Sequence, residues 1–211
     1  MAGATNGTSH EPPGDRSSSG LREQNARDRR EALVEAAYAL FAEKGYAHTT
    51  MDEVAERAGL SRRTAFRYFS SKEELVFPAR EARLAMLRAE LRPRAAERGF
   101  ETVRRACLAL AKHFEADRER QLAQWRILRG EPALVGRDLD FDRESEAAIE
   151  AAFAAGERDT PRARRRAKVR AAAVTGAVRA TLREWLEGGA SADLGKLGRE
   201  TFAELEAGFA D

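Results

Sequence analysis

Residues 49–72 read TTMDEVAERAGLSRRTAFRYFSSK, and this stretch decides the fold of the N-terminal part of the chain. Thr50 is placed to cap a first short helix, and Glu53 follows three residues later, as a capping box requires. Gly59 comes directly after the apolar positions of that helix, at a turn where a left-handed backbone costs glycine least. Ser61 can then cap a second helix. The stretch therefore predicts two short helices joined by a tight turn, the helix-turn-helix arrangement.

The second of these helices opens with Ser-Arg-Arg-Thr. In DNA-binding helix-turn-helix proteins this helix lies in the major groove, where arginine can bond guanine O6 and N7 and threonine can offer a hydroxyl or a methyl group. We expect Ala65, Phe66 and Phe69 to point inward, which leaves the polar positions for DNA; the alternative is an ordinary solvated face. The candidate DNA-binding residues are Thr50, Ser61, Arg62, Arg63, Thr64, Arg67, Tyr68 and Lys72.

Some of these residues are candidates for phosphate rather than base contacts, because helix N-termini, phenols and ammonium groups fix the register on the DNA backbone. They are Thr50, Tyr68 and Lys72, together with Tyr46. Thr50 would serve as a cap with or without DNA. Tyr46 is equally explained as a packed turn aromatic.

Charge supports DNA binding only through its position. The formal net charge of the 211 residues is +2. Residues 21–76 contain ten Lys or Arg and ten Asp or Glu, a balance of zero. The cations Arg62, Arg63, Arg67 and Lys72, however, gather after the turn. We expect this basic edge to bind DNA with an affinity that falls steeply with salt.

The composition predicts an all-α protein without a disulfide. Hydrophobic residues make up 43% and charged residues 34% of the chain, and no sustained alternating segment indicates a sheet. The single cysteine, Cys107, excludes an internal disulfide and a cysteine-built zinc site. No apolar run reaches the roughly 20 residues of a membrane span, and no signal peptide is recognisable. We therefore expect a cytoplasmic protein with no membrane partner.

Three regions are expected along the chain. Residues 1–24 are rich in Gly, Ser, Thr and Pro and predict a disordered arm. Residues 25–71 form the helix-turn-helix domain, whose first helix is expected from about Ala26 to Lys44. Residues 72–211 form a helical body, and the whole chain should hold about nine helices. Ser71 and Glu74 predict a capping box that opens a long helix, which Pro78 should kink.

The body offers residues for a small-molecule cavity but none for catalysis. The candidate ligand-binding residues are Cys107, His113, Phe114, Trp125, Leu128, Phe141 and Phe153. Ordinary core packing explains most such residues equally well. The three histidines are far apart in sequence, so no metal site is expected, and no catalytic or cofactor motif is present. We predict neither an enzyme nor a cofactor.

The helix-turn-helix domain, which we call the head, resembles a known family. Residues 31–46, EALVEAAYALFAEKGY, with TTMDEVAERAGLS at 49–61 and YFSSKEEL at 68–75, resemble the DNA-binding domain of the tetracycline-repressor (TetR) family. The resemblance implies a three-helix head that binds a DNA operator and a body that binds a small-molecule effector. It also implies a homodimer formed by the last two helices. Family members usually repress transcription until the effector pulls the two heads out of register with the operator.

Small and apolar residues of the last two helices are the candidates for that dimer interface: Val169, Ala173, Gly176, Ala177, Ala180, Leu194, Leu197, Phe202 and Leu205. The chain is also similar to a subgroup whose bodies are described as binding acyl-CoA-like ligands, which includes the mycofactocin-type regulators. The resemblance is carried by SRRT at 61–64 with FRYF at 66–69, RILRGEPAL at 126–134 and LREWLEGG at 182–189. Two positions depart from the family. Phe66 stands where tyrosine is common and lacks the hydroxyl that reaches DNA, so it would touch a thymine methyl or simply pack. Ser70 replaces a frequent proline.

Three alternatives remain open. The chain could be a helical small-molecule carrier or an enzyme that keeps the head as a scaffold. It could also be an activator rather than a repressor. The basic run at residues 162–170 could bind an anion such as a CoA phosphate, or be a solvated face paired with nearby acids.

Overall fold

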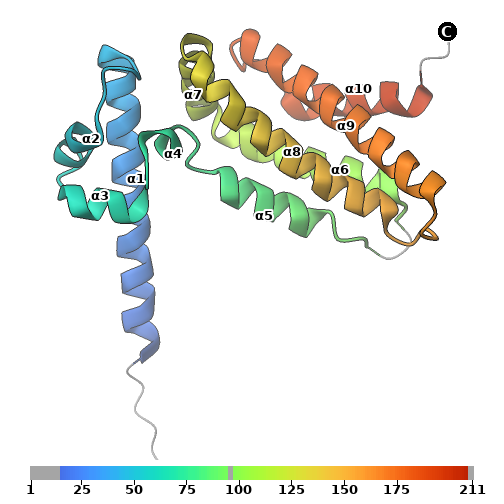
Figure 1. The fold of residues 1–211 in the computed structure, drawn as a ribbon, viewed down its shortest axis with the longest axis horizontal. Helices are drawn as coiled ribbons and strands as arrows, with labels where there is room; N and C mark the ends of the chain where they lie inside the picture. Colours follow the sequence, from blue (N-terminus) through green and yellow to red (C-terminus); the bar gives the residue numbers. More distant parts are fainter. Residues whose placement is uncertain (1–14, 95–96, 209–211) are drawn as a thin grey trace, which may run out of the picture.

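The computed structural model describes residues 15–94 and 97–208, which form ten α-helices and no strand. Helices α1 to α4 form a head that lies beside a longer body made of α5 to α10 (Figure 1). The all-α prediction is confirmed. None of the helices in the described ranges is long and apolar enough to cross a membrane. The helices are α1 (Asp15–Lys44), α2 (Met51–Arg57), α3 (Arg62–Tyr68), α4 (Lys72–Val76), α5 (Arg80–Glu90), α6 (Gly99–Ala116), α7 (Arg118–Gly130), α8 (Pro132–Ala154), α9 (Pro161–Glu187) and α10 (Leu194–Ala207).

The head is built around α1. One face of this helix buries Leu33, Val34, Ala37 and Phe41 against the apolar residues of α2, α3 and α4. Leu134, from the first turn of α8, belongs to the same cluster. The core of the head is therefore completed by a residue of the body.

Helix α1 is longer than the sequence pattern predicts. It begins at Asp15 rather than near Ala26, so the prediction of a disordered arm is wrong for residues 15–24; residues 1–14 lie outside the described part of the chain. The added turns bury no apolar side chain, and Leu21 is exposed. Extending an existing helix adds one hydrogen bond per residue without a new nucleation step, so the extension needs no amphipathic pattern. In Figure 1 this N-terminal half projects beyond α2 and α3.

A break at Pro78 separates head from body. The prediction of one kinked helix is wrong, because α4 ends at Val76 and α5 begins at Arg80, which explains ten helices instead of about nine. Proline has no amide hydrogen and clashes with the preceding turn. The carbonyls freed by the break find partners on α1: Tyr38 Oη donates to Val76 O at 2.8 Å and Arg30 Nη2 to Pro78 O at 2.9 Å.

The body contains two apolar clusters. One joins α5, α6, α8, α9 and α10, and the other surrounds Trp185, whose Nε1 donates to Ala192 O at 2.9 Å. Phe202 is buried in the first cluster and Leu194 in the second. Their prediction as dimer-interface residues is therefore corrected, because both belong to the core of one protomer. Leu205 and Leu197 are half-buried against the same two clusters, respectively.

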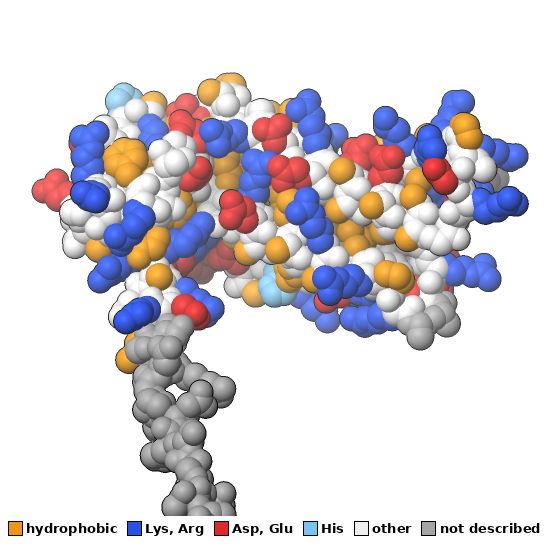
Figure 2. Space-filling model, turned by 60° about the horizontal axis from the view of Figure 1, so that its bottom comes forward, with side chains coloured by type: hydrophobic (Ala, Val, Ile, Leu, Met, Phe, Trp, Pro, Cys, Tyr) orange, Lys and Arg blue, Asp and Glu red, His pale blue; other side chains and the backbone are white. Residues whose placement is uncertain are grey.

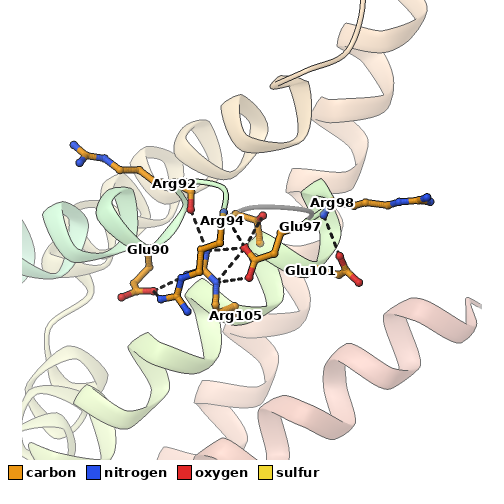
Figure 3. Close-up of polar contacts among 8 residues, drawn as sticks. Glu90, Arg92, Arg94, Glu97, Arg98, Glu101 and Arg105 are labelled. Carbon is orange, nitrogen blue, oxygen red and sulfur yellow. Dashed lines mark hydrogen bonds and ion pairs between the residues drawn. The ribbon is translucent and has the colours of Figure 1, made fainter.

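An arginine-centred network fastens the connection between α5 and α6 (Figure 3). Arg105 Nη1 donates to Glu90 Oε2 at 2.6 Å, and its Nε donates to Glu97 Oε1 at 2.9 Å. Its Nη2 also bonds Arg92 O at 3.1 Å. The hydrogen bonds from Arg105 hold the pKa of Glu97 at about 2. One guanidinium thus ties the end of α5 and the following loop to α6.

Candidate nucleic-acid interface and ligand cavity

The start of α2 carries the expected capping box. Glu53 N donates to Thr50 Oγ1 at 3.3 Å, and Thr50 N donates to Glu53 Oε2 at 2.9 Å. Lys44 also pairs with Glu53, and these bonds lower the pKa of Glu53 to about 2. The N-terminus of α2 is therefore fixed before any DNA arrives.

The turn and the start of α3 also follow the local sequence. Gly59 has φ +66°, the left-handed conformation that favours glycine. Ser61 caps α3, because Thr64 N donates to Ser61 Oγ at 3.2 Å. The two side-chain hydroxyls of this pair lie 2.9 Å apart, so the Thr64 hydroxyl is already hydrogen-bonded.

Phe66 does not point inward as predicted. It is 40% exposed, whereas Ala65 and Phe69 are buried. Ala65 is the fully buried residue of α3, Phe69 is its C-cap, and Tyr68 packs half-buried against the same core. Phe66 is turned about 100° round the helix from Ala65, which brings its ring to the outer surface. The guanidinium of Arg62 lies 5.4 Å from the Phe66 ring and its Nη1 is 2.8 Å from Asp52 Oδ2.

The remaining cations of the predicted edge differ in how strongly they are held. Arg63 makes no hydrogen bond or ion pair with any described residue, and Arg67 only lies over the ring of Tyr68 at 5.2 Å. Lys72 Nζ donates to Tyr46 O at 2.7 Å and lies 4.1 Å from the Tyr46 ring. The hydroxyl of Tyr46 in turn donates to Glu73. Lys and Arg side chains gather over the head in Figure 2.

The body contains a partly open cavity of about 200 Å³ between α5, α6, α7, α8, α9 and α10. Five of the seven predicted ligand residues line it: Cys107, Phe114, Trp125, Leu128 and Phe141. His113 is instead exposed on α6, and Phe153 is buried in the core cluster of α5, α6, α8, α9 and α10. Burial raises the pKa of the Cys107 thiol to about 12, so it is a neutral wall residue.

The sequence analysis missed the polar residues of this cavity: Arg83, Gln121, Gln124, Asp142, Ser145, Thr175, Arg179, Thr181, Arg183 and Thr201. Polar residues on a helix predict a solvent-exposed face, and only the tertiary packing shows which of them line a cavity. Arg179 Nη1 lies 3.3 Å from Asp142 Oδ2, and burial raises the pKa of Asp142 despite this partner. Within residues 15–94 and 97–208 no three His, Cys, Asp or Glu side chains are placed to hold a metal ion.

A chain of polar contacts leads from the cavity to the head. Gln121 Nε2 donates to Asp117 Oδ2 at 3.3 Å, and Arg83, which also lines the cavity, has Nη2 3.9 Å from the same oxygen. Asp117 Oδ1 is 3.6 Å from Arg120 Nε, and Arg120 pairs with Glu31 of α1. No sequence motif indicated this connection, since its members are spread from residue 31 to residue 121.

One face of α9 is open to solvent. Val169, Ala173 and Ala180 are exposed, and Gly176 and Ala177 are half-buried. The basic run at the start of the same helix is partly neutralised. Arg164 pairs with Asp159, and Arg166 and Arg170 both lie within ion-pair distance of Glu157. These contacts favour the solvated face over an anion site.

Comparisons with known proteins cover both parts of the chain. Residues 33–78 match the family described as bacterial regulatory proteins, tetR family, and residues 97–210 match the MftR C-terminal domain. The regulator TcmR of Streptomyces glaucescens is 34% identical over 148 residues, 65% of this chain and 64% of its own. The match thus spans less than two thirds of that relative.

Solved structures share the fold. The repressor NalD of Pseudomonas aeruginosa superposes with a TM-score of 0.64 at 18% identity, over 87% of this chain and 97% of its own. FadR of Bacillus subtilis, solved with stearoyl-CoA, gives a TM-score of 0.63 at 16% identity, over 85% and 99% of the two chains.

Proposed function

Because the chain belongs to the tetR family of bacterial regulatory proteins, we propose that it is a ligand-responsive repressor of transcription. In this proposal it is a cytoplasmic homodimer that places α3 of each subunit in successive major grooves of a near-palindromic operator. The observation that carries the proposal is the pre-capped helix-turn-helix, whose second helix leaves Arg63 and Arg67 without ion-pair partners among the described residues. Unpaired guanidinium groups at an exposed helix are the chemistry that guanine edges and phosphates require.

The remaining predicted contacts divide by geometry. Arg62, Thr64 and Phe66 are exposed or half-exposed on α3 and suit base edges, with Phe66 offering an apolar contact to a thymine methyl. Thr50, Ser61, Tyr68 and Lys72 lie at helix ends and beside the turn, which suits phosphates. The dimer would use the exposed row of α9.

The effector would act through the polar chain described above. A molecule in the cavity touches Gln121 and Arg83, and both contact Asp117. Asp117 meets Arg120, whose partner Glu31 lies on the central helix of the head. A change in the cavity would therefore shift α1 relative to α7 and alter the spacing of the two heads.

Selection from a random DNA library tests the proposal, followed by binding measurements with Arg63→Glu. We expect at least a tenfold loss of affinity for the selected site, because a good arginine–guanine pair contributes about 1–3 kcal/mol and the reversal adds repulsion. Arg162→Glu is the matched control: it makes the same change of charge at the end of α9 that Figure 1 places away from the head. Equal binding by the two variants, or no site recovered by selection, would reject the proposal.

A further inference from the structure

Three buried polar atoms without hydrogen-bond partners line the cavity of the body. They are Gln124 Oε1 on α7, Ser145 Oγ on α8 and Thr175 Oγ1 on α9. Gln124 and Ser145 are each only 8% exposed. Buried polar groups in native proteins nearly always have a partner, and a group left without one lowers stability. Three such groups from three helices around one space indicate that the partner is a molecule that enters that space.

Most of the remaining wall is apolar. Leu87, Leu110, Trp125, Phe141 and Leu182 face the same space. At about 200 Å³, the cavity is smaller than the roughly 300–1,000 Å³ of sites that enclose drug-sized ligands. The occupant must therefore be compact and largely apolar, with few polar atoms.

The polar wall groups also restrict the charge of the occupant. The three unpartnered groups are one amide oxygen and two hydroxyls, all neutral. An amide oxygen can only accept, so it requires a donor such as a ligand hydroxyl, whereas the hydroxyls can serve a ligand oxygen. Three arginines line the cavity. Arg179 pairs with Asp142, Arg83 lies over Phe114 and near Asp117, and Arg183 is exposed to solvent on α9. A carboxylate beside the three neutral groups would have no uncommitted, buried cation of its own among the described residues, which is costly.

Resting on the proposed function, we infer that the effector is a compact, uncharged, mostly apolar molecule with at least one hydroxyl. That hydroxyl bonds Gln124, and Ser145 and Thr175 bond a neighbouring oxygen. The assignment differs from the acyl-CoA class that the body's family resemblance implies, since a CoA thioester presents phosphates and an extended chain.

Three molecules with one apolar body test the assignment: naphthalene, 2-naphthol and 2-naphthoate. Their dissociation constants are measured by calorimetry on the full chain without DNA. We expect 2-naphthol to bind about tenfold more tightly than naphthalene, as one or two net hydrogen bonds would give, and 2-naphthoate to bind more weakly than 2-naphthol. In the triple variant Gln124→Leu, Ser145→Ala, Thr175→Val the tenfold preference should disappear.

Thr181→Val is the matched control. Thr181 lines the same cavity and is also 8% exposed, but its hydroxyl already donates to Ala177 O at 3.0 Å and lies 2.6 Å from Thr201 Oγ1. This variant should keep the preference for 2-naphthol and lose thermal stability. The triple variant should lose none, because Gln124 Oε1, Ser145 Oγ and Thr175 Oγ1 have no hydrogen-bond partner within the described part of the protein.

The outcomes separate clearly. Equal binding of 2-naphthol and naphthalene, tightest binding of 2-naphthoate, a preference that survives in the triple variant, or no binding of any of the three at their solubility limits would each overturn the assignment. Lower thermal stability of the triple variant would overturn it too, since the three atoms would then have structural partners. DNA takes no part in these measurements, so failure to find an operator leaves their result unchanged.

Discussion

The ion pair between Glu31 of α1 and Arg120 of α7 gives a quantitative prediction about how head and body are joined. Arg120 hydrogen-bonds Glu31 and lowers its pKa, and Glu31 raises the pKa of Arg120. The pKa of the acid falls and the pKa of the base rises, and both shifts report attraction between the two side chains. The perturbation is a double-mutant cycle made of Glu31→Gln, Arg120→Met and their combination.

The size of the coupling follows from exposure. Two unit charges 4 Å apart attract by about 4 kcal/mol at an effective dielectric constant of 20, which is a ceiling. The Glu31 side chain is 49% exposed and that of Arg120 26%, so solvent screening and the cost of ordering two long side chains reduce this value. We expect a coupling of about 1 kcal/mol at neutral pH, near the upper end for exposed pairs.

Urea unfolding of the four proteins measures this coupling. Because the pKa of Glu31 is lower in the folded state, its stabilisation is complete above the unfolded pKa, about 4.3, and is lost as the pH falls through the folded value. The coupling should therefore shrink steadily below about pH 4. The pair Arg164–Asp159 is the control: both side chains are mostly exposed on one local segment, and their coupling should be clearly smaller than that of Glu31 and Arg120. A coupling near zero at pH 7, or one that does not change with acid, would refute the reasoning.

Other substitutions test single features. Gly59→Ala should lower the free energy of unfolding by about 1 kcal/mol, because φ is +66° although a methyl group would meet no atom within 4 Å; unchanged stability in urea would contradict this. Trp185→Phe should lower it by about 1–3 kcal/mol by leaving Ala192 O without its donor, and thermal unfolding at the wild-type midpoint would argue against the role of that bond. Ala173→Glu should convert the proposed dimer to monomer in sedimentation velocity; an unchanged dimer would remove this part of α9 from the interface.

The parts of the head that the sequence predicts are those fixed by short-range contacts. Thr50, Gly59 and Ser61 act within three or four residues of themselves, so their roles can be read without knowing the rest of the fold. The orientation of Phe66 depends on which row of α3 faces α1. Phe66, Tyr68 and Phe69 lie within four residues of the chain, so the sequence alone does not show which of these aromatic side chains faces the core.

The body was harder to predict because its helices carry apolar residues on more than one face. Leu194 and Phe202 repeat at helical spacing, and that pattern is the same for a protomer core and for a dimer interface. Gln124 and Ser145 pose the opposite difficulty, because they are polar and yet buried. Polarity predicts exposure on average, and only the packed structure shows which polar side chains face inward. Five of the seven predicted residues line the cavity because apolar side chains on the helices of the body mostly face inward.

The position of Leu134 limits how DNA-binding heads can be exchanged between regulators, for example to build a biosensor. The break at Pro78 looks like a natural seam, and the head family's match ends at that residue. Leu134, however, fills the head's apolar cluster from across that seam, with Ile127 and Leu128 packed beside it. In a chimaera joined at residue 78, the head would lack Leu134, and the apolar site that this side chain fills would be exposed. The transferred segment should therefore include the turn between α7 and α8, or the apolar residues around the Leu134 site should be redesigned to fit the new body.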